Sequence, residues 1–449
     1  MNTKLKTFLG GIHQPDCKEF SAACRIQDVP LPKRVYLPVV QHIGAPAAPL
    51  VQVGQNVKKG EKIADSEAFV SAPVHASISG TVVDIKNHPH PGGSEVTTII
   101  IESDGKDGWF REPHNGQDPL DLEPEEIRKK IREAGIVGLG GAAFPTQVKL
   151  SVPKGKPIDA VILNGAECEP YLTADYRLML EKAESIVKGL QILLRILGVE
   201  RGFIGIEANK PEAIAAMGKA AARVPQIEVV GLKVRYPQGA EKQLIKTILN
   251  REVPPPPGLP LDVGVVVQNV GTAYAIYEAA AWGKPLIERI VTVTGKGIRE
   301  PKNLRLRLGT LFSEAISHCG GFQGEVGKIL MGGPMMGLAQ YTTDVPVIKG
   351  TSGILVLTAE ECQSQEASHC INCGMCVRAC PMRLVPSLIG TYCEKDLLDE
   401  AEAHHVLDCI ECGSCAYVCP AKRHLVHLVK YGKSAILAKK RRQGKPEKG

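Results

Sequence analysis

Aromatic residues are scarce in this chain, at 4% of its 449 residues, whereas glycine (46) and proline (32) are plentiful. Such a composition favours many short elements and tight turns over a few large cores. At about 100–200 residues per domain, the length predicts three or four packed units. Long hydrophobic runs are also absent, since no window approaches the ~18 apolar residues that a membrane-spanning helix needs. The N-terminus lacks the apolar core and cleavage pattern of a signal peptide, so we expect a soluble protein.

A strong charge of either sign is missing as well. The net charge of +6 is too small over this length to indicate nucleic-acid binding. The basic residues that do cluster lie in a C-terminal tail at 431–449, at Lys439, Lys440, Arg441, Arg442, Lys445 and Lys448. Such a tail could contact anionic lipid or an acidic partner. The simpler interpretation is a disordered, solubilising tail.

Cysteine, in contrast, is concentrated in one region. Nine of the 14 cysteines fall between Cys370 and Cys419, and eight of these form two copies of the pattern Cys-x2-Cys-x2-Cys-x3-Cys-Pro. This is the spacing of two-cluster ferredoxins, in which the fourth cysteine of each run binds the other cluster. We predict two 4Fe-4S clusters in a helical ferredoxin domain at 360–430. The expected ligands are Cys370, Cys373, Cys376 and Cys419 for one cluster, and Cys380, Cys409, Cys412 and Cys415 for the other.

Zinc ribbons are the alternative for this region. They usually take two separated Cys-x2-4-Cys knuckles, which four cysteines within eleven residues do not match. Cys393 lies between the two motifs without a partner at a ligand spacing, so we expect a small buried residue there.

Residues 50–103 alternate short Val/Ile-rich runs with Gly and Asn turns. The halves 51–64 and 72–85 resemble the two halves of the lipoyl/biotinyl barrel-sandwich fold. In carrier proteins of that fold the hairpin tip holds an acylated lysine, but here the tip reads EAFVS (67–71) and has no lysine. We therefore predict a barrel-sandwich domain that acts as a structural or docking module, preceded by an N-terminal arm at 1–49.

Strands and helices alternate after a polar connector, which predicts a mostly parallel sheet covered on both faces, a Rossmann-like α/β domain at 124–287. The expected strands are 158–164, 203–207, 227–234 and 263–269, and the expected helices are 124–134, 176–197, 211–223, 240–250 and 271–282. A second β-rich stretch with one short helix predicts a β-grasp module at 288–350. The fold class is thus multidomain α/β.

A glycine-rich loop, GLGGAAFPTQVK (138–149), lies between the first of these helices and the first strand. It lacks the Gly-Lys-Ser/Thr of a nucleoside triphosphate loop. Its Gly-x-Gly-x-x-Ala follows a helix instead of a strand, so the usual dinucleotide fingerprint fails on context. A loop with so little side chain can lay backbone N–H groups against a phosphate or a flat ring. The alternative is a tight structural turn.

This loop resembles the GxRGRGGAGFPTGxKW loop of the flavin-binding subunit of respiratory complex I. Three further segments follow in the same order: NGAECEP (164–170) resembles NADEGEPG, YPQGAE (236–241) resembles Y-x-x-GEE, and QNVGT (268–272) resembles NNVET. The resemblance implies an FMN site that includes Gly138, Gly140, Lys149, Asn164, Asn269 and Thr272, and it also makes Gly141 and Gly239 cofactor-binding residues. It further implies that NAD(H) faces Phe144, Glu167, Glu169 and Glu241.

The residue types suit this chemistry. Backbone N–H groups and Lys149 suit a flavin phosphate, and Phe144 offers a face for adenine. Two acids of the family motifs are replaced by Ala166 and Ala240, which weakens the NADH prediction more than the FMN prediction. The alternative for Glu167 and Glu169 is a pair of surface turn carboxylates, and for Asn269 a cap at a strand end. Hydride transfer needs no side-chain acid or base, so we predict no catalytic side chain.

Over its full length the chain resembles the RnfC family of the Rnf electron transport complex. The resemblance rests on the N-terminal GGIHQPDCKEFS, the armless barrel-sandwich, the flavin loop, an SLBB-like β-grasp and the twin ferredoxin motifs. The family typically begins GGIHPP, where this chain has Gln14, and a long Ala/Lys-rich extension of some members is absent.

The family resemblance implies a peripheral subunit on the cytoplasmic side of the cell membrane. Together with other subunits it would form a ferredoxin:NAD oxidoreductase that couples electron flow to ion translocation. We expect NAD(H) to exchange a hydride with FMN, and the clusters to relay single electrons. Two alternatives stay open from the sequence. One is the cobalamin reductase of bacterial microcompartments, and the other is an iron–sulfur electron wire without flavin.

Overall fold

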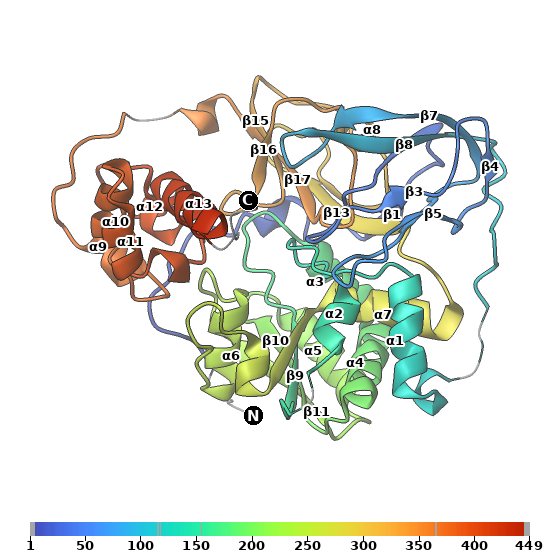
Figure 1. The fold of residues 1–449 in the computed structure, drawn as a ribbon, viewed down its shortest axis with the longest axis horizontal. Coiled ribbons are helices and arrows are strands. Elements are labelled where there is room, and N and C mark those ends of the chain that lie inside the picture. Colours follow the sequence, from blue (N-terminus) through green and yellow to red (C-terminus); the bar gives the residue numbers. More distant parts are fainter. Residues whose placement is uncertain (1–4, 115, 117, 154, 364–365, 444–449) are drawn as a thin grey trace, which may run out of the picture.

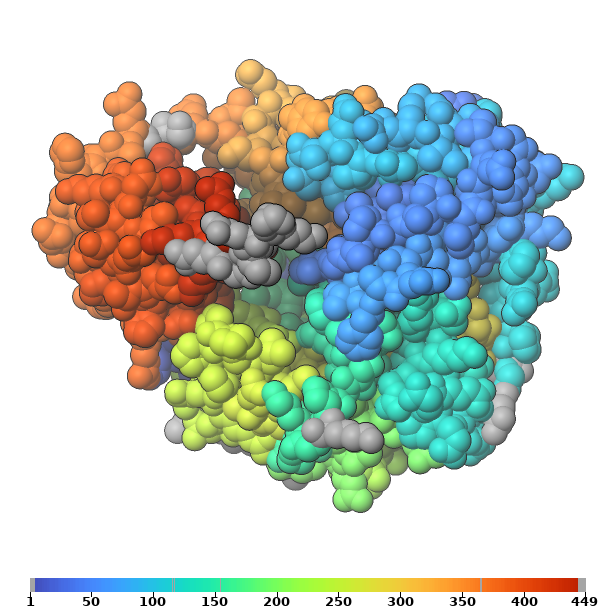
Figure 2. All heavy atoms as spheres, in the orientation of Figure 1, coloured from blue at the N-terminus to red at the C-terminus, as the bar shows by residue number. Residues whose placement is uncertain are grey.

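The computed structural model describes residues 5–114, 116, 118–153, 155–363 and 366–443. Figure 1 shows an α/β domain, two β-rich modules beside it and a separate lobe of helices at the C-terminal end. In the space-filling view of Figure 2 this lobe, drawn in orange to red, stands beside the remaining modules.

The α/β domain is built on a parallel sheet of four strands in the order β11-β10-β9-β12. Their bounds are β9 (Ala160–Asn164), β10 (Gly202–Glu207), β11 (Ile227–Leu232) and β12 (Val265–Asn269). The strands are rich in Val and Ile because helices bury both faces. The covering helices are α1 (Pro124–Glu133), α3 (Ala174–Glu181), α4 (Ala183–Leu197), α5 (Pro211–Ala221), α6 (Glu241–Leu249) and α7 (Val270–Trp282).

Alternate residues of each strand enter two separate cores. Val161 and Leu163 of β9 pack in the core formed with α1, α3, α4, α5 and α7. Ile162, between them, packs in the smaller core with α6. The expected single helix at 176–197 is wrong in one respect: the chain breaks between α3 and α4, where Lys182 leaves the helical conformation.

The barrel-sandwich comprises a sheet in the order β2-β8-β7-β4 and a small sheet in the order β3-β5-β6. The strands are β2 (Arg34–Pro38), β3 (Ala48–Pro49), β4 (Asn56–Val57), β5 (Lys62–Asp65), β6 (Val74–His75), β7 (Gly80–Pro89) and β8 (Glu95–Ser103). Its core is continuous with that of the β-grasp module, since Leu37 and Ile99 share one hydrophobic cluster with Val293 and Phe312.

The β-grasp module is a six-stranded sheet in the order β1-β14-β13-β17-β15-β16, covered by α8 (Phe312–Ser317). The strands are β1 (Ile26–Asp28), β13 (Glu288–Thr294), β14 (Lys302–Arg307), β15 (Val326–Met331), β16 (Leu338–Gln340) and β17 (Gly353–Thr358). The module extends beyond the expected 288–350. Strand β17 lies between β13 and β15, and the N-terminal arm supplies β1.

The N-terminal arm connects three parts of the molecule. Lys6 forms a bridge with Leu232 at the edge of the parallel sheet, and Ile12 pairs with Tyr236. Between them, the Gly11 N–H donates to the carbonyl of Ala379 in the helical lobe (2.9 Å). Gly10 must be a glycine, since its φ is +80° and a Cβ would lie 2.7 Å from the carbonyl oxygen of Cys380.

The helical lobe contains α9 (Met375–Ala379), α10 (Pro386–Glu394), α11 (Leu398–Ala403), α12 (Ser414–Tyr417) and α13 (Leu425–Gln443). Cys393 is buried in its core, as predicted. The expectation of a disordered tail from 431 is wrong as far as Gln443, because α13 continues to that residue. Ion pairs from Lys439 to Asp399 and from Lys440 to Glu402 tie its last turns to α11. Lys445 and Lys448 lie outside the described residues.

Lys349 is a fully buried cation at the junction of three modules. Its ammonium donates to the carbonyls of Pro73 in the barrel-sandwich and Gly135 before the glycine loop, both at 2.7 Å. Burial lowers the pKa of Lys349 to about 7; Asp65 opposes this shift and Arg132 adds to it.

We expect the wild type to gain stability relative to Lys349→Met as the pH rises from about 7 to 10. The pKa of Lys349 in the folded protein, about 7, lies below its ordinary 10.5. Within this window the unfolded chain binds a proton that the folded protein lacks, so a higher pH disfavours unfolding, by up to about 1.4 kcal/mol for each pH unit. Melting temperatures of both proteins from pH 7 to 9.5 measure the effect. If the difference between the melting temperatures of the two proteins did not change with pH, the lowered pKa of Lys349 would be contradicted.

Candidate functional site

The order of the parallel strands creates a switch point between β9 and β12. The chain proceeds from β9 outward through β10 and β11, and then returns to the other side of β9 to form β12. In open α/β sheets, ligands bind outside the carboxyl ends of the strands at such a point. Asn164 and Asn269 are the last residues of β9 and β12, and they are register partners. The two segments singled out from the sequence therefore meet where this fold binds ligands.

A cavity of about 420 Å³ opens at this point, within the range of small-molecule and cofactor sites. All predicted cofactor residues except Gly141 and Thr272 line it: Gly138, Gly140, Phe144, Lys149, Asn164, Glu167, Glu169, Gly239, Glu241 and Asn269. Gly141 lies on the exposed outer part of the loop. Thr272 is buried, and its hydroxyl accepts the N–H of Leu139 (2.8 Å), so it anchors the loop from behind.

The glycine loop stands on a short bridge between Val137 and Pro145, and the Gly138 N–H donates to the carbonyl of Phe144 (2.8 Å). A Cβ built at Gly140 would approach no atom closer than 3.5 Å, the nearest being Cβ of Asn269. The protein itself therefore leaves room at this glycine. The bare backbone faces the cavity instead, which fits a flat or phosphorylated ligand laid against the loop.

The two asparagines are held by local hydrogen bonds. Asn164 donates through Nδ2 to the carbonyl of Gly239 (2.7 Å), which joins the second and third motif segments. Asn269 caps α7 by accepting the N–H of Gly271 (2.7 Å), and its Nδ2 donates to Asp175 (2.6 Å). Asn269 is thus a cap at a strand end and a cavity residue at once, so the two interpretations are compatible.

Glu167 and Glu169 are half-buried and line the cavity, so they are not the exposed turn carboxylates of the alternative interpretation. The carboxylate of Glu167 accepts the N–H groups of Asp175 and Tyr176 at the start of α3 (2.7 and 3.1 Å). That of Glu169 accepts the N–H of Met336 in the β-grasp module (2.9 Å). Burial raises the pKa of each glutamate to about 7. Both side chains therefore brace the cavity wall through backbone groups.

Lys149 and Glu241 form an ion pair on the cavity wall, with 2.7 Å between Nζ and Oε1. Each side chain is about one third exposed. Lys149 also donates to the carbonyl of Val267 in β12 (3.1 Å). The pair joins the residue predicted for the flavin phosphate to one predicted for the nicotinamide nucleotide.

Sequence reasoning missed several lining residues, chief among them Asp175, Arg289, Tyr236, Cys168 and Ile410. Cys168 and Tyr236 lie inside recognised motif segments and could have been proposed from them. Arg289 comes from the β-grasp module and Ile410 from the helical lobe, so only the tertiary fold brings them to the cavity.

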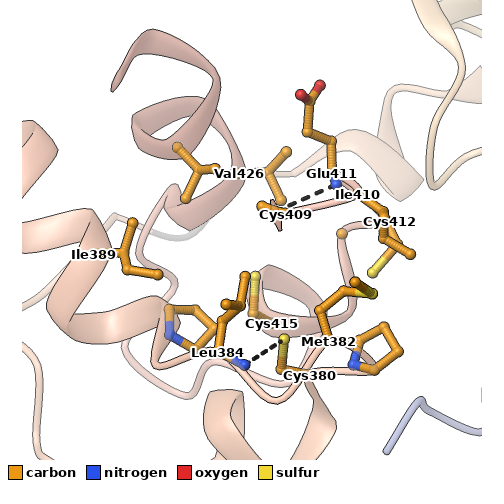
Figure 3. Close-up of a pocket in the computed structure, with 14 residues that line it drawn as sticks. Cys380, Met382, Leu384, Ile389, Cys409, Ile410, Glu411, Cys412, Cys415 and Val426 are labelled. Carbon is orange, nitrogen blue, oxygen red and sulfur yellow. Dashed lines mark hydrogen bonds between the residues drawn. The ribbon is translucent and has the colours of Figure 1, made fainter. Parts of the chain in front are cut away.

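The eight cysteines of the twin motifs surround two further cavities. One, in Figure 3, is lined by Cys380, Cys409, Cys412 and Cys415. The other is lined by Cys370, Cys373, Cys376 and Cys419. These are the two ligand sets predicted from the spacing. Among the described residues, no three His, Cys, Asp or Glu side chains converge on a point that could hold a single metal ion.

The first of these cavities suits the cationic core of a cluster. Burial raises the pKa of the Cys409 thiol to about 11 and that of Cys415 to about 12. Such thiols keep their protons unless a metal takes their place. Backbone N–H groups of Leu384 and Glu411 point at the sulfurs of Cys380 and Cys409 (3.4 and 3.3 Å; dashed in Figure 3), where they would stabilise thiolate charge.

The cavity beside the glycine loop, which we call the flavin-type cavity, shares one wall with the first cysteine cavity. Ile410, the residue after Cys409, lines both. Around it, Cys168 and Tyr236 of the α/β domain pack with Cys412 in one apolar cluster. The second cysteine cavity shares no lining residue with the flavin-type cavity.

Family models match all four modules. They are described as the RnfC barrel sandwich hybrid domain (residues 6–106), the Nuo51 FMN-binding domain (131–278), the SLBB domain (290–339) and the 4Fe-4S dicluster domain (362–420). Fold and site together define an electron-transfer protein with FMN and two 4Fe-4S clusters as its cofactors. No helix among the described residues is long and apolar enough to span a membrane.

Known proteins narrow this class to one family. The chain is 54% identical to a subunit, designated C, of the proton-translocating ferredoxin:NAD(+) oxidoreductase complex of Clostridium ljungdahlii, over 96% of this chain and 94% of that protein. It is 48% identical to the Na(+)-translocating counterpart of Acetobacterium woodii, over 98% of this chain and all of that protein. The chain therefore belongs to the RnfC family, whose members are subunits of the ion-translocating ferredoxin:NAD(+) oxidoreductase complexes.

A more distant likeness exists among solved structures. An NAD+-reducing [NiFe]-hydrogenase aligns with 74% of this chain and 68% of its own, at 18% identity and a TM-score of 0.49. A likeness at this level carries no argument about function.

Proposed function

We propose that this chain is the NAD(H)-linked, FMN- and iron–sulfur-containing subunit of a ferredoxin:NAD oxidoreductase complex that couples electron flow to ion translocation. The observation that carries the proposal is the shared wall at Ile410. It places a cavity lined by the complex I-like motif residues directly beside a cavity lined by four cysteines. A site for two-electron transfer with NAD(H) and a site for one-electron transfer would therefore lie side by side within one chain.

FMN bound in the larger cavity would accept two electrons as a hydride and release them singly, which a nicotinamide nucleotide cannot do. The chain holds and orients both groups. The glycine loop, Asn164 and Asn269 would hold the flavin, and Lys149 would attract its phosphate. Phe144, near the outer part of the loop, would stack the adenine of NAD(H). The residues around Ile410, among them Tyr236 and Cys412, form an apolar cluster between the two cavities.

The two cysteine sets would act in series. The set around Cys412 lies next to the flavin-type cavity and would receive electrons first or deliver them last. The other set opens outward, since Cys370 and Cys373 are exposed. A partner subunit would exchange electrons there. We further propose that the protein is peripheral and lies on the cytoplasmic side of the membrane, held by the other subunits of the complex.

Cofactor content and reduction by NADH test this function. The chain is purified anaerobically, its iron, sulfide and FMN are quantified, and the absorbance of flavin and clusters is followed as NADH is added. We expect about eight irons and one FMN per chain, both chromophores being bleached by NADH. Bound FMN that NADH does not reduce would contradict the prediction of a nicotinamide site. The replacement of two motif acids by Ala166 and Ala240 would then be the expected cause. Eight irons without FMN would leave only an electron wire.

A further inference from the structure

Arg289 brings a positive charge to the flavin cavity from a neighbouring module. It lies in β13 of the β-grasp sheet, yet it lines the cavity of the α/β domain. Its side chain is only 7% exposed. Burial lowers the pKa of its guanidinium to about 10, and Asp175 opposes that shift, so the group stays charged at neutral pH.

Two nitrogens of the Arg289 guanidinium donate hydrogen bonds to backbone carbonyls. Nη2 donates to the carbonyl of Leu139, near the start of the glycine loop (3.1 Å), and Nε donates to the carbonyl of Thr351 (3.1 Å). Within the described part of the chain, Nη1 has no hydrogen-bond partner, and no carboxylate oxygen lies within 4 Å of the group. A buried guanidinium with unpaired N–H donors lowers the stability of the folded protein unless a ligand accepts hydrogen bonds from those donors.

Residues 138–148 of the glycine loop contain no Lys or Arg, so Lys149 is the one cation of this loop. The complex I motif has arginines in GxRGRGG where this chain has Val137 and Leu139. The other cation of the cavity wall, Lys149, is already paired with Glu241. Among the lining residues, Arg289 is therefore the cation without a carboxylate partner. The flavin nucleotide is negatively charged at its phosphate and, when reduced, at its ring.

We propose that Arg289 is a positioning residue of the flavin site, which fixes the glycine loop through the carbonyl of Leu139 and directs its free N–H groups toward negative charge on the bound flavin nucleotide. Leu139 is then held from both sides, because Thr272 accepts its N–H group (2.8 Å). The β-grasp module thus takes part in flavin binding. This inference rests on the proposed function, since it requires that FMN occupies the cavity.

The experiment titrates FMN, and separately riboflavin, with deflavinated protein that retains its clusters, and follows the quenching of flavin fluorescence. The proteins are the wild type, Arg289→Met and Arg289→Lys. We expect Arg289→Met to weaken FMN binding about tenfold or more, as for the loss of a charge-assisted hydrogen bond, and Arg289→Lys to restore most of the affinity. Arg177→Met is the matched control, because Arg177 is also buried but does not line the cavity.

The riboflavin titration identifies which charge is recognised. A loss confined to FMN assigns Arg289 to the phosphate. An equal loss for both flavins, with a more negative flavin midpoint potential, assigns it to the reduced ring. Iron content shows that each variant is folded. Wild-type affinity and potential in Arg289→Met, or no rescue by Arg289→Lys, would overturn the inference alone. A wild type that binds no FMN would overturn the proposed function as well.

Discussion

Gly140→Val is expected to empty the flavin site while leaving both clusters in place. The bare backbone of Gly140 lines the cavity, and a Cβ there would meet only Asn269, at an ordinary distance of 3.5 Å. The chain can therefore fold around valine, whose two methyl groups would then occupy space that the flavin needs. We expect FMN affinity to fall by at least about a hundredfold, a loss of roughly 3 kcal/mol. Iron content should stay at the wild-type value, since Gly140 lines neither cysteine cavity.

Gly218→Val serves as the matched control for this change. Gly218 lies in α5, on the side of the sheet that α3 and α4 also cover, and a Cβ there would meet nothing within 4 Å. FMN content after anaerobic purification and fluorescence titration of the deflavinated proteins measure the effect. Full FMN occupancy in Gly140→Val would mean that the flavin does not lie against the glycine loop.

Some residues that line the cavities could be predicted from short stretches of sequence. Asn164 and Asn269 could be predicted because each lies in a short segment that resembles a complex I motif, and the parallel strands that they end bring both to one edge of the sheet. The cysteine sets could be predicted because the spacing of the ligands is local, even though each fourth ligand crosses to the other set. In both cases the relevant geometry is fixed over a few residues.

Contacts between modules escaped prediction for the opposite reason. Arg289 reaches Leu139 across 150 residues of sequence, and no local pattern marks it among the other arginines of the chain. The arm provides a second example. The segment GGIH was one of the features that indicated the family, but only the fold shows that Gly10 packs against Cys380 while Ile12 pairs with Tyr236. The arm thereby ties the helical lobe to the α/β domain.

Cysteine substitutions in the two sets are expected to give opposite results with NADH. Cys412 belongs to the set beside the flavin-type cavity, and Cys373 belongs to the outward set. Electron transfer through protein weakens steeply with distance. Loss of the inner cluster in Cys412→Ala should therefore block NADH from reducing the remaining cluster, whereas flavin bleaching persists. In Cys373→Ala the inner cluster should still be reduced by NADH, and transfer to an external acceptor should fall at least about tenfold.

Electron paramagnetic resonance of NADH-reduced samples distinguishes these outcomes, with dithionite reduction showing which cluster each variant retains. Cys393→Ala is the control, because Cys393 is buried in the same lobe but lines neither cysteine cavity. It should keep about eight irons and wild-type behaviour. The reverse pattern, with NADH reducing the outer cluster of Cys412→Ala but not the inner cluster of Cys373→Ala, would mean that electrons do not cross the wall at Ile410. The flavin would then have to transfer electrons to the outward set through residues that do not line the flavin-type cavity.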